Sequence, residues 1–544
     1  MNTVAAPRSG HPSGELRSET WVRLSALALV LLTAVLAVVW SHVKLLSQDE
    51  IFVLQTDTVS SLRELIHIQR HFPISLDPLI FHLLAHAATR IFGPSALALR
   101  LPAILGFLLM QVCLFLATRR IAGAHAALVA LAFPALTATL FYAPEARPYG
   151  LLLGLYALTF LAWQTATRAA DPAVAARAGH SSQVDPRPPR TGTLVLLAIA
   201  IALTLNTHYF GILLLAPLCL AELVRTVLRR RLDLPVVAAI VLGMTGILGA
   251  LPFQRAAGEF RKHYYNAGGV NFHAITQSYR ALFVSYTDQS IAIQQIAIVL
   301  LSIAAAVLVL AVILALRKRT VNLPSAELAF LLTLAALPLF GFLIAFFVTH
   351  SIEVRYVLGA IVAIAIFAAI ALAPWLRPTR TAQAIAALLF VGVLLGGFVR
   401  IRSEQRKSTA VLASLILAPE LKARLLALPD SHLYLQNMGH FEVASYYEPD
   451  PEVRSRLALL HSREAELQWD RHDTASLTAE HMQHFTGFRI VPYAELQRIP
   501  GEHMLVLFHS GWDWTDQALA SGHASISPLG PALDGDAVAV QFLP

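Results

Sequence analysis

The sequence predicts an α-helical polytopic membrane protein that ends in a soluble α/β domain. Hydrophobic residues make up 56% of its 544 residues, charged residues only 14%, and the mean hydropathy is +0.61. Soluble domains carry about 25% charged residues, so this composition excludes an ordinary soluble protein. Apolar runs of about 18–22 residues recur, and each is long enough to cross a hydrocarbon core of about 30 Å.

The apolar runs predict about eleven transmembrane helices. They cover residues 21–43, 97–117, 124–142, 150–167, 193–206, 210–228, 234–253, 291–316, 328–348, 356–375 and 382–399. The first run is longer than a signal peptide needs and many spans follow it, so we interpret it as a retained anchor. Residues 1–20 then form a cytoplasmic tail and residues 21–400 the membrane domain.

The basic residues predict which loops face the cytoplasm. Arginine and lysine recur in alternate connections, which follows the positive-inside rule. These connections contain Arg119–Arg120, Arg168–Arg190, Arg229–Arg231, Arg317–Arg319 and Arg377–Arg380. The long loop 44–96, the shorter links 143–149, 254–290 and 349–355, and the C-terminal region are then outside. The net charge of +7 reflects this topology, and the scattered cations predict no nucleic-acid partner.

Residues 401–544 have the composition of a soluble domain, which we place in the periplasm. Short apolar runs at 432–436, 504–508 and 537–542 predict strands, and residues 420–428 and 514–520 predict helices. The proline- and arginine-rich insert 169–190 is expected to be a flexible loop on the cytoplasmic side. Cys113 and Cys219 both fall within predicted spans, so no disulfide framework is expected.

An acidic pair, Asp49-Glu50, follows the first predicted span. A carboxylate held where protein, lipid and water meet is partly desolvated, which suits it to accept a proton from a hydroxyl. The alternative is a solvated helix end, because acids are common after a span.

Three short motifs place cations and tyrosines at the outer membrane boundary. Arg147 and Tyr149 lie in PEARPYG, where Pro144 and Pro148 stiffen the turn. The other motifs contribute His208, Tyr209, Arg355 and Tyr356. An outer arginine runs against the charge bias, and its planar fork suits a phosphate. Pairing with Glu145, contact with lipid headgroups and the usual boundary tyrosines are the alternatives. The segment 261–266 adds further donors, and His481 with His484 is a weak metal candidate that surface histidines explain equally well.

In order and spacing these motifs resemble the GT-C superfamily of polytopic glycosyltransferases, in particular the bacterial family-39-like group related to protein O-mannosyltransferases and the lipid A aminoarabinose transferase. The resemblance covers about residues 21–399. Its motifs are Asp49-Glu50, DPLIFHLL (77–84), FGPSALALRLPAILG (92–106), PEARPYG (144–150), THYFG (207–211) and EVRY (353–356). Relatives often read His-Pro-Pro-Leu where this chain has Leu76-Asp77-Pro78-Leu79, and EVRY is a loosened Glu-Arg-Tyr.

The resemblance implies an inverting transfer of a sugar from a polyprenyl-phosphate donor on the outer face of the inner membrane. The implied acceptor is a glycan, lipid or protein hydroxyl. By matching position Asp49 is the expected base, and Glu50 orients the acceptor or Asp49. Arg147, Tyr149, His208, Tyr209, Arg355 and Tyr356 are expected to bind the donor phosphate. No metal or other cofactor is expected. A transporter or lipid flippase is the alternative from another class, and an inactive relative acting as a sensor is a third.

Overall fold

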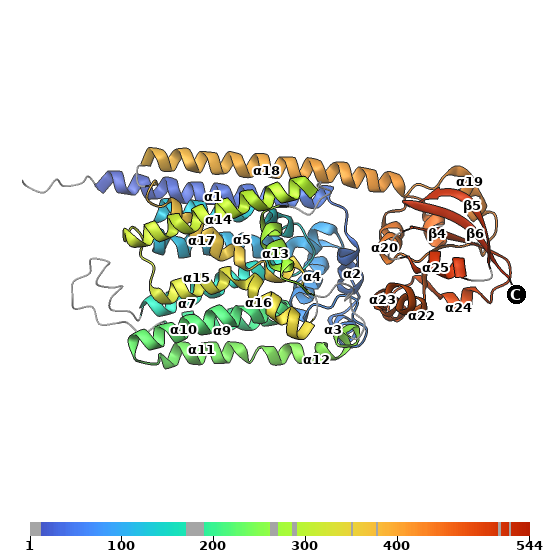
Figure 1. Ribbon diagram of the computed structural model, residues 1–544, viewed down its shortest axis with the longest axis horizontal. Coiled ribbons are helices and arrows are strands. Elements are labelled where there is room, and N and C mark those ends of the chain that lie inside the picture. The colour runs from blue at the N-terminus through green and yellow to red at the C-terminus, as the bar shows by residue number, and fades with distance from the viewer. Residues whose placement is uncertain are drawn as a thin grey trace, which may run out of the picture.

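The computed structural model describes residues 12–169, 190–261, 270–284, 291–349, 352–376, 379–509, 513–521 and 524–543. The predicted flexible insert 169–190 and the donor-rich segment 261–266 lie almost entirely outside these ranges. In Figure 1 a bundle of long helices forms one end of the molecule, and a smaller unit with a β-sheet forms the other.

Within these ranges, seven helical segments are long and apolar enough to cross a membrane, and an eighth segment qualifies as a bent pair. The seven contain α1 (Pro12–Val43), α5 (Ala96–Ala122), α7 (Tyr149–Ala169), η2 (Tyr209–Leu214) with α10 (Leu215–Arg229), α11 (Leu234–Met244) with α12 (Ile247–Ala257), α14 (Ile291–Arg317) and α18 (Thr379–Ser414). This is a multi-pass α-helical membrane architecture, as the composition predicts.

The eighth segment bends by 53° between α15 (Ser325–Ala335) and α16 (Leu337–Ile344). Pro338 lies in the first turn of α16, where its missing N–H breaks the helical hydrogen-bond ladder. The remaining predicted spans correspond to shorter apolar helices, namely α6 (Ala124–Leu136), α9 (Thr191–Thr207) and α17 (Ala360–Leu372). Every predicted apolar run therefore forms a helix, but three of these helices are shorter than a full membrane crossing.

The long loop 44–96 is itself helical. It contains α2 (Gln48–Asp57), α3 (Leu62–His71) and α4 (Leu79–Phe92). These helices lie at the end of the bundle that faces the sheet unit (Figure 1). On the same side η3 (Glu259–Arg261), α13 (His273–Phe283), the π-helix η4 (Ala345–Thr349) and η5 (Val354–Val357) connect later helices.

The C-terminal unit contains a six-stranded mixed sheet in the order β3-β2-β1-β4-β6-β5. The first four strands in this order are parallel; β6 pairs antiparallel with β4, and β5 pairs antiparallel with β6 at the edge of the sheet. The strands are β1 (Leu433–Leu435), β2 (Leu457–His461), β3 (Arg489–Pro492), β4 (Glu502–Leu507), β5 (Ala524–Ala532) and β6 (Gly535–Phe542). The strands predicted from three short apolar runs are confirmed.

Helices surround this sheet and link it to the bundle. They are α19 (Pro419–Leu426), α20 (Met438–Tyr447), α21 (Pro451–Ser455), α22 (Arg463–Ala465), η6 (Glu466–Asp470), α23 (Thr474–Met482), α24 (Tyr493–Leu496) and α25 (Trp514–Ser521). Helix α18 runs on past position 400 as far as Ser414, so one continuous helix leads from the bundle to the sheet unit (Figure 1). The predicted helices at 420–428 and 514–520 are α19 and α25.

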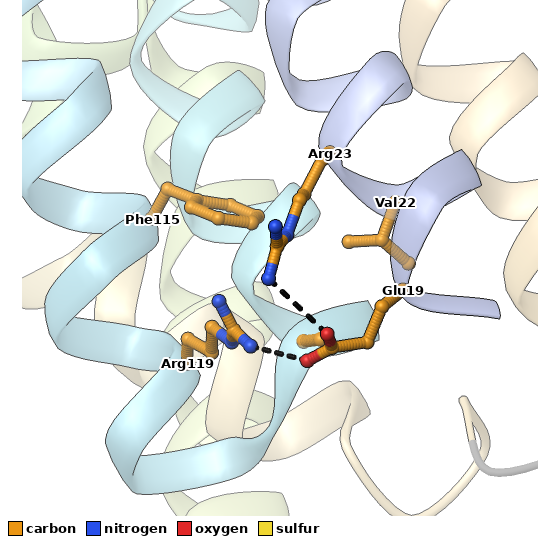
Figure 2. A pocket seen from close by; sticks show the side chains of 6 residues that line it. Glu19, Val22, Arg23, Phe115 and Arg119 are labelled. Atoms are coloured by element: carbon orange, nitrogen blue, oxygen red, sulfur yellow. Dashed lines mark hydrogen bonds and ion pairs between the residues drawn. The ribbon is translucent and has the colours of Figure 1, made fainter. Parts of the chain in front are cut away.

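Ion pairs lie at both ends of α1, an exposed one at its start and a buried one at its end. At the start of α1, Glu19 lies between Arg23 and Arg119 and lines a small hollow with Val22, Phe115 and Ala124 (Figure 2). The side chains of Arg23 and Glu19 are 65% and 49% exposed, so solvent screens this pair.

At the opposite end of α1, a fully buried pair joins Arg100 of α5 to Glu50 of α2. Arg100 Nε lies 2.8 Å from Glu50 Oε1, and Arg100 Nη2 lies 3.1 Å from Glu50 Oε2. The same guanidinium donates to the carbonyls of Ser41, Lys44 and Leu45, where α1 ends. One arginine thereby satisfies one carbonyl of the last turn of α1 and two carbonyls of the connection after it, and it fixes the start of α2.

Replacing Arg100 tests this anchor. We expect Arg100→Met to reduce the free energy of unfolding by about 3–5 kcal/mol, because it leaves a buried carboxylate without its main partner. The matched control, Arg23→Met, removes a solvent-screened pair and should change it by about 0–1 kcal/mol. Thermal unfolding of both variants in detergent measures the difference. Equal midpoints for the two variants would show that Arg100 is not an anchor.

Candidate functional site

Helix α2 presents Asp49 in its first turn. Ser47 precedes the helix in an extended conformation, and its backbone N–H donates to Glu50 Oε2 over 3.1 Å. This closes the helix start, where a negative side chain is also favoured by the helix dipole. Asp49 is 36% exposed, whereas its neighbour Glu50 is completely buried.

Two arginines from distant parts of the chain converge on Asp49. Arg147 Nη1 lies 2.7 Å from Asp49 Oδ2, and Arg355 Nη1 lies 3.2 Å from the same oxygen. Arg147 precedes α7 and Arg355 lies in η5. The three residues come from three of the sequence motifs, and the fold brings them together as one ionic cluster.

A second carboxylate, Asp77, lies behind Arg147. Arg147 Nη2 is 3.3 Å from Asp77 Oδ2, and His208 Nε2 is 3.5 Å from Asp77 Oδ1. Burial by itself would raise the pKa of Asp77, but the positive charge of Arg147, supported by that of Arg355, outweighs it and holds this pKa below its ordinary value. In the sequence, Asp77 stands out only as a departure from the family pattern. Its apolar context, Leu76-Asp77-Pro78-Leu79, was the available signal for a buried acid.

His208 is neutral in this arrangement. Burial lowers the pKa of His208 to about 4; Arg147 and Arg355 add to this effect and Asp77 opposes it. The Nδ1 atom accepts the backbone N–H of Phe210 over 3.1 Å. The proton of the neutral ring is therefore on Nε2, which faces Asp77.

Aromatic rings close the side of the cluster. The ring centroid of His208 is 5.5 Å from that of Tyr149 and 5.4 Å from that of Tyr356. Tyr356 stacks on Phe210 at 4.2 Å, and the Tyr149 hydroxyl lies 3.4 Å from Arg147 Nη2. Tyr209 is half-buried at the first position of η2. Rings with polar edges beside two arginines form a surface that suits an anionic group attached to an apolar chain.

Glu50 has no exposed oxygen to offer a substrate. Beyond its two bonds to Arg100, it accepts the backbone N–H of Ala146 over 2.7 Å and lies 3.2 Å from Lys44 Nζ. Burial alone would raise the pKa of Glu50, but Lys44 and Arg100 hold it far below its ordinary value. The geometry connects Glu50 to Asp49 through the helix backbone, because the two are adjacent in its first turn.

The structure bears on two alternatives raised from the sequence, namely an Arg147–Glu145 pair and a metal site at His481 and His484. Arg147 pairs with Asp49 and Asp77 rather than with Glu145. Burial raises the pKa of Glu145 to about 7. In the ranges that the structure describes, no group of three or more His, Cys, Asp or Glu side chains is arranged to hold a metal ion. His481 bonds to the Pro73 carbonyl over 2.8 Å, and His484 stacks on Phe72.

Comparison with solved structures identifies the fold. No protein-family model and no curated protein sequence matches the chain. Among solved structures, the apo form of ArnT from Cupriavidus metallidurans is similar at a TM-score of 0.56 and 17% identity, covering 94% of this chain and 97% of that one. ArnT from the same organism bound to undecaprenyl phosphate is similar at a TM-score of 0.57 and 15% identity, covering 96% and 98%. The chain therefore shares the fold of these two ArnT structures.

Asp77 can be tested apart from Asp49. We expect Asp77→Asn to lower the free energy of unfolding by about 1–3 kcal/mol, because Arg147 and His208 lose a buried charged partner. Asp49→Asn, at a more exposed position, should cost less than about 1 kcal/mol. Thermal unfolding in detergent measures both.

The pH dependence of this difference has a defined sign. A carboxyl group whose pKa is lowered on folding stabilises the fold above its ordinary pKa of 3.8, and this stabilisation is lost as the pH falls below that value. The gap between wild type and Asp77→Asn should thus be constant near neutral pH and narrow in acid. A gap that widened in acid would contradict the ionised assignment of Asp77.

Proposed function

We propose that the chain is a membrane glycosyltransferase that moves a sugar from a polyprenyl-phosphate donor to an acceptor hydroxyl, with inversion at the anomeric carbon. The observation that carries the proposal is Asp49 held between Arg147 and Arg355 beside a neutral His208. A proton acceptor and phosphate-binding cations are the two components that such a transfer needs. The similarity in fold to ArnT, one structure of which holds undecaprenyl phosphate, supports it.

The resting cluster also suggests how the donor engages. Both arginines contact the same oxygen of Asp49, so the carboxylate occupies the position that a donor phosphate would take. A phosphate offers more acceptor oxygens than one carboxylate, and planar guanidinium groups bind it in fork geometry. We propose that the donor phosphate takes over Arg147 and Arg355. Asp49 is then free to receive the acceptor proton only when donor is bound.

The chemical step follows from this exchange. The acceptor oxygen attacks the anomeric carbon, and the carbon–oxygen bond to phosphate breaks on the opposite side. The bonding electrons leave with the polyprenyl phosphate, whose developing charge is stabilised by the two arginines. The acceptor proton passes to Asp49. Glu50 keeps Asp49 in place by anchoring the first turn of α2 to Arg100, so it acts on the base and not on the acceptor.

The position of the site fits a lipid-linked donor. The cluster lies where α7, η2 and η5 begin, at the end of the bundle nearest the sheet unit. An isoprenoid tail can then lie among the apolar helices while its phosphate stays at the boundary. With the arginine bias of the loops, this end is outside, so we propose a multi-pass inner-membrane protein with the C-terminal unit in the periplasm. The acceptor is a glycan, lipid or protein hydroxyl.

Transport is less well supported. A transporter commonly places ionisable groups near the middle of the bilayer, on broken helices. In the described part of this bundle, Arg100 in α5 and Glu327 in α15 lie in the first turns of their helices, and Glu222 in the middle of α10 is neutralised by Arg225 one turn further along.

The role of Asp49 gives the first test of function. Asp49→Asn keeps the size of the side chain but cannot take the proton, so we expect transfer to fall by about 10²–10⁴-fold. Turnover is measured with purified protein, a lipid-phosphate sugar and an acceptor. Asp430→Asn, which alters an exposed acid of the C-terminal unit, should be unchanged. Near wild-type turnover in Asp49→Asn would rule out Asp49 as the base.

Binding of the donor lipid tests whether its phosphate replaces Asp49 as the partner of Arg147 and Arg355. We expect Arg147→Ala and Arg355→Ala each to weaken binding of undecaprenyl phosphate by about tenfold or more, the effect of losing one charge-assisted hydrogen bond. Asp49→Asn should bind this lipid more tightly than wild type, because the arginines no longer have a competing carboxylate. Arg454→Ala, an exposed arginine of the C-terminal unit, is the control. Weaker binding in Asp49→Asn would contradict the exchange.

A further inference from the structure

Helix α2 is buried on two opposite faces. Glu50 and Asp57 face the bundle, where they meet Arg100 and His82. Gln48, Phe52 and Gln55 are spaced by four and three residues, so they share another face of the helix. That face meets the C-terminal unit, because Phe52 belongs to the same apolar cluster as the residues behind its sheet.

Polar contacts continue along this seam between the loop 44–96 and the C-terminal unit. The backbone N–H of Leu46 donates to the hydroxyl of Tyr447 over 2.6 Å. The rings of Phe72 and His484 stack with centroids 3.8 Å apart. A Cβ at position 439 would lie 3.0 Å from Gln48 Oε1, so α20 approaches the side chain of Gln48 closely there. The C-terminal unit therefore holds the helix that carries Asp49.

One pair of side chains in the seam, Gln55 and Glu442, contains more buried hydrogen-bond acceptors than donors. Gln55 Nε2 donates to Glu442 Oε2 over 2.6 Å, and Glu442 is completely buried on α20. Glu442 Oε1 and Gln55 Oε1 are both buried, and neither has a donor among the described residues. A carboxylate can only accept hydrogen bonds, so an ionised Glu442 would leave Glu442 Oε1 and Gln55 Oε1 without a hydrogen bond. A neutral carboxyl group supplies the one O–H that Gln55 Oε1 needs.

The surroundings of Glu442 favour the neutral form. Helix α20 packs against α2, α21, β1 and β2. Their titratable or charged side chains are Asp49, Glu50 and Asp57 on α2, Glu452 and Arg454 on α21, Tyr434 on β1 and His461 on β2. Burial raises the pKa of Glu442 to about 8, and the bond from Gln55 is the opposing influence.

We propose that Glu442 is a positioning residue for the transfer reaction: its neutral carboxyl group pairs with the Gln55 amide and fixes the helix that carries Asp49. The inference rests on the proposed function, in which Asp49 is the base. When Glu442 ionises, it has no O–H to donate, Glu442 Oε1 and Gln55 Oε1 stay buried without a donor, and the seam loosens.

The pH dependence follows from a pKa that is higher in the closed seam than in water. Below the ordinary pKa of 4.5 Glu442 is protonated in both states and the seam has its full stability. As the pH rises from 4.5 through about 8, the open state loses the proton first, so the closed seam becomes progressively weaker. Above about 8 both states are ionised and no further loss occurs.

The decisive variant is Glu442→Gln, which keeps the shape and the donor but cannot ionise. In wild type we expect kcat to fall about tenfold between about pH 6.5 and pH 8.5, with unchanged affinity for undecaprenyl phosphate. Glu442→Gln should lose this fall and keep full kcat at the higher pH. Gln55→Ala should have a low kcat at both pH values. Glu495→Gln, an exposed acid, should behave as wild type.

A second measurement needs no activity. The difference between infrared spectra of wild type and Glu442→Gln should contain a carboxylic-acid carbonyl band that disappears as the pH rises through about 8. Absence of this band at pH 6.5, or an alkaline fall in kcat that persists in Glu442→Gln, would overturn the proposal. A titrating band in a protein without transfer activity would support the seam and contradict the proposed function, so the two failures are distinguishable.

Discussion

The buried pair between Arg100 and Glu50 is the interaction on which the rest of the structure depends. It joins the end of α1, the start of α2 and, through the N–H of Ala146, the turn before α7. It fixes the first turn of α2, from which Asp49 meets Arg147 and Arg355. A charge pair of this kind contributes little to net stability, but it selects one arrangement among several. Here the selected arrangement is the ionic cluster.

The carboxylates of the site lie in two different environments, one buried and one partly exposed to solvent. Glu50 and Asp77 are buried and permanently satisfied, whereas Asp49 is partly exposed and its partners are exchangeable. This division separates the residues that hold the geometry from the one that changes partner. Under the proposed function, it also accounts for a base surrounded by cations: the two arginines bind the donor phosphate, and Asp49 balances their charge when no donor is bound.

Much of this could be predicted from the sequence, and the rest could not for physical reasons. The long apolar runs located the membrane helices, and the motifs located Asp49, Arg147, His208 and Arg355. The helices α2, α3 and α4 were missed because their polar and apolar residues match no membrane span. Asp77 and Glu442 were missed because burial and hydrogen-bond balance depend on residues far apart in the chain, such as the partners Arg147 and Gln55.

The unbroken course of α18 has a mechanical consequence. A helix turns by about 100° and rises about 1.5 Å for each residue. The number of residues in α18 therefore sets how the C-terminal unit is rotated about the axis of this helix. One residue added between Arg400 and Ser414 would rotate that unit by more than a quarter of a turn, away from α2. The number of residues in this stretch is therefore constrained independently of their identity, because it sets which face of the C-terminal unit meets α2.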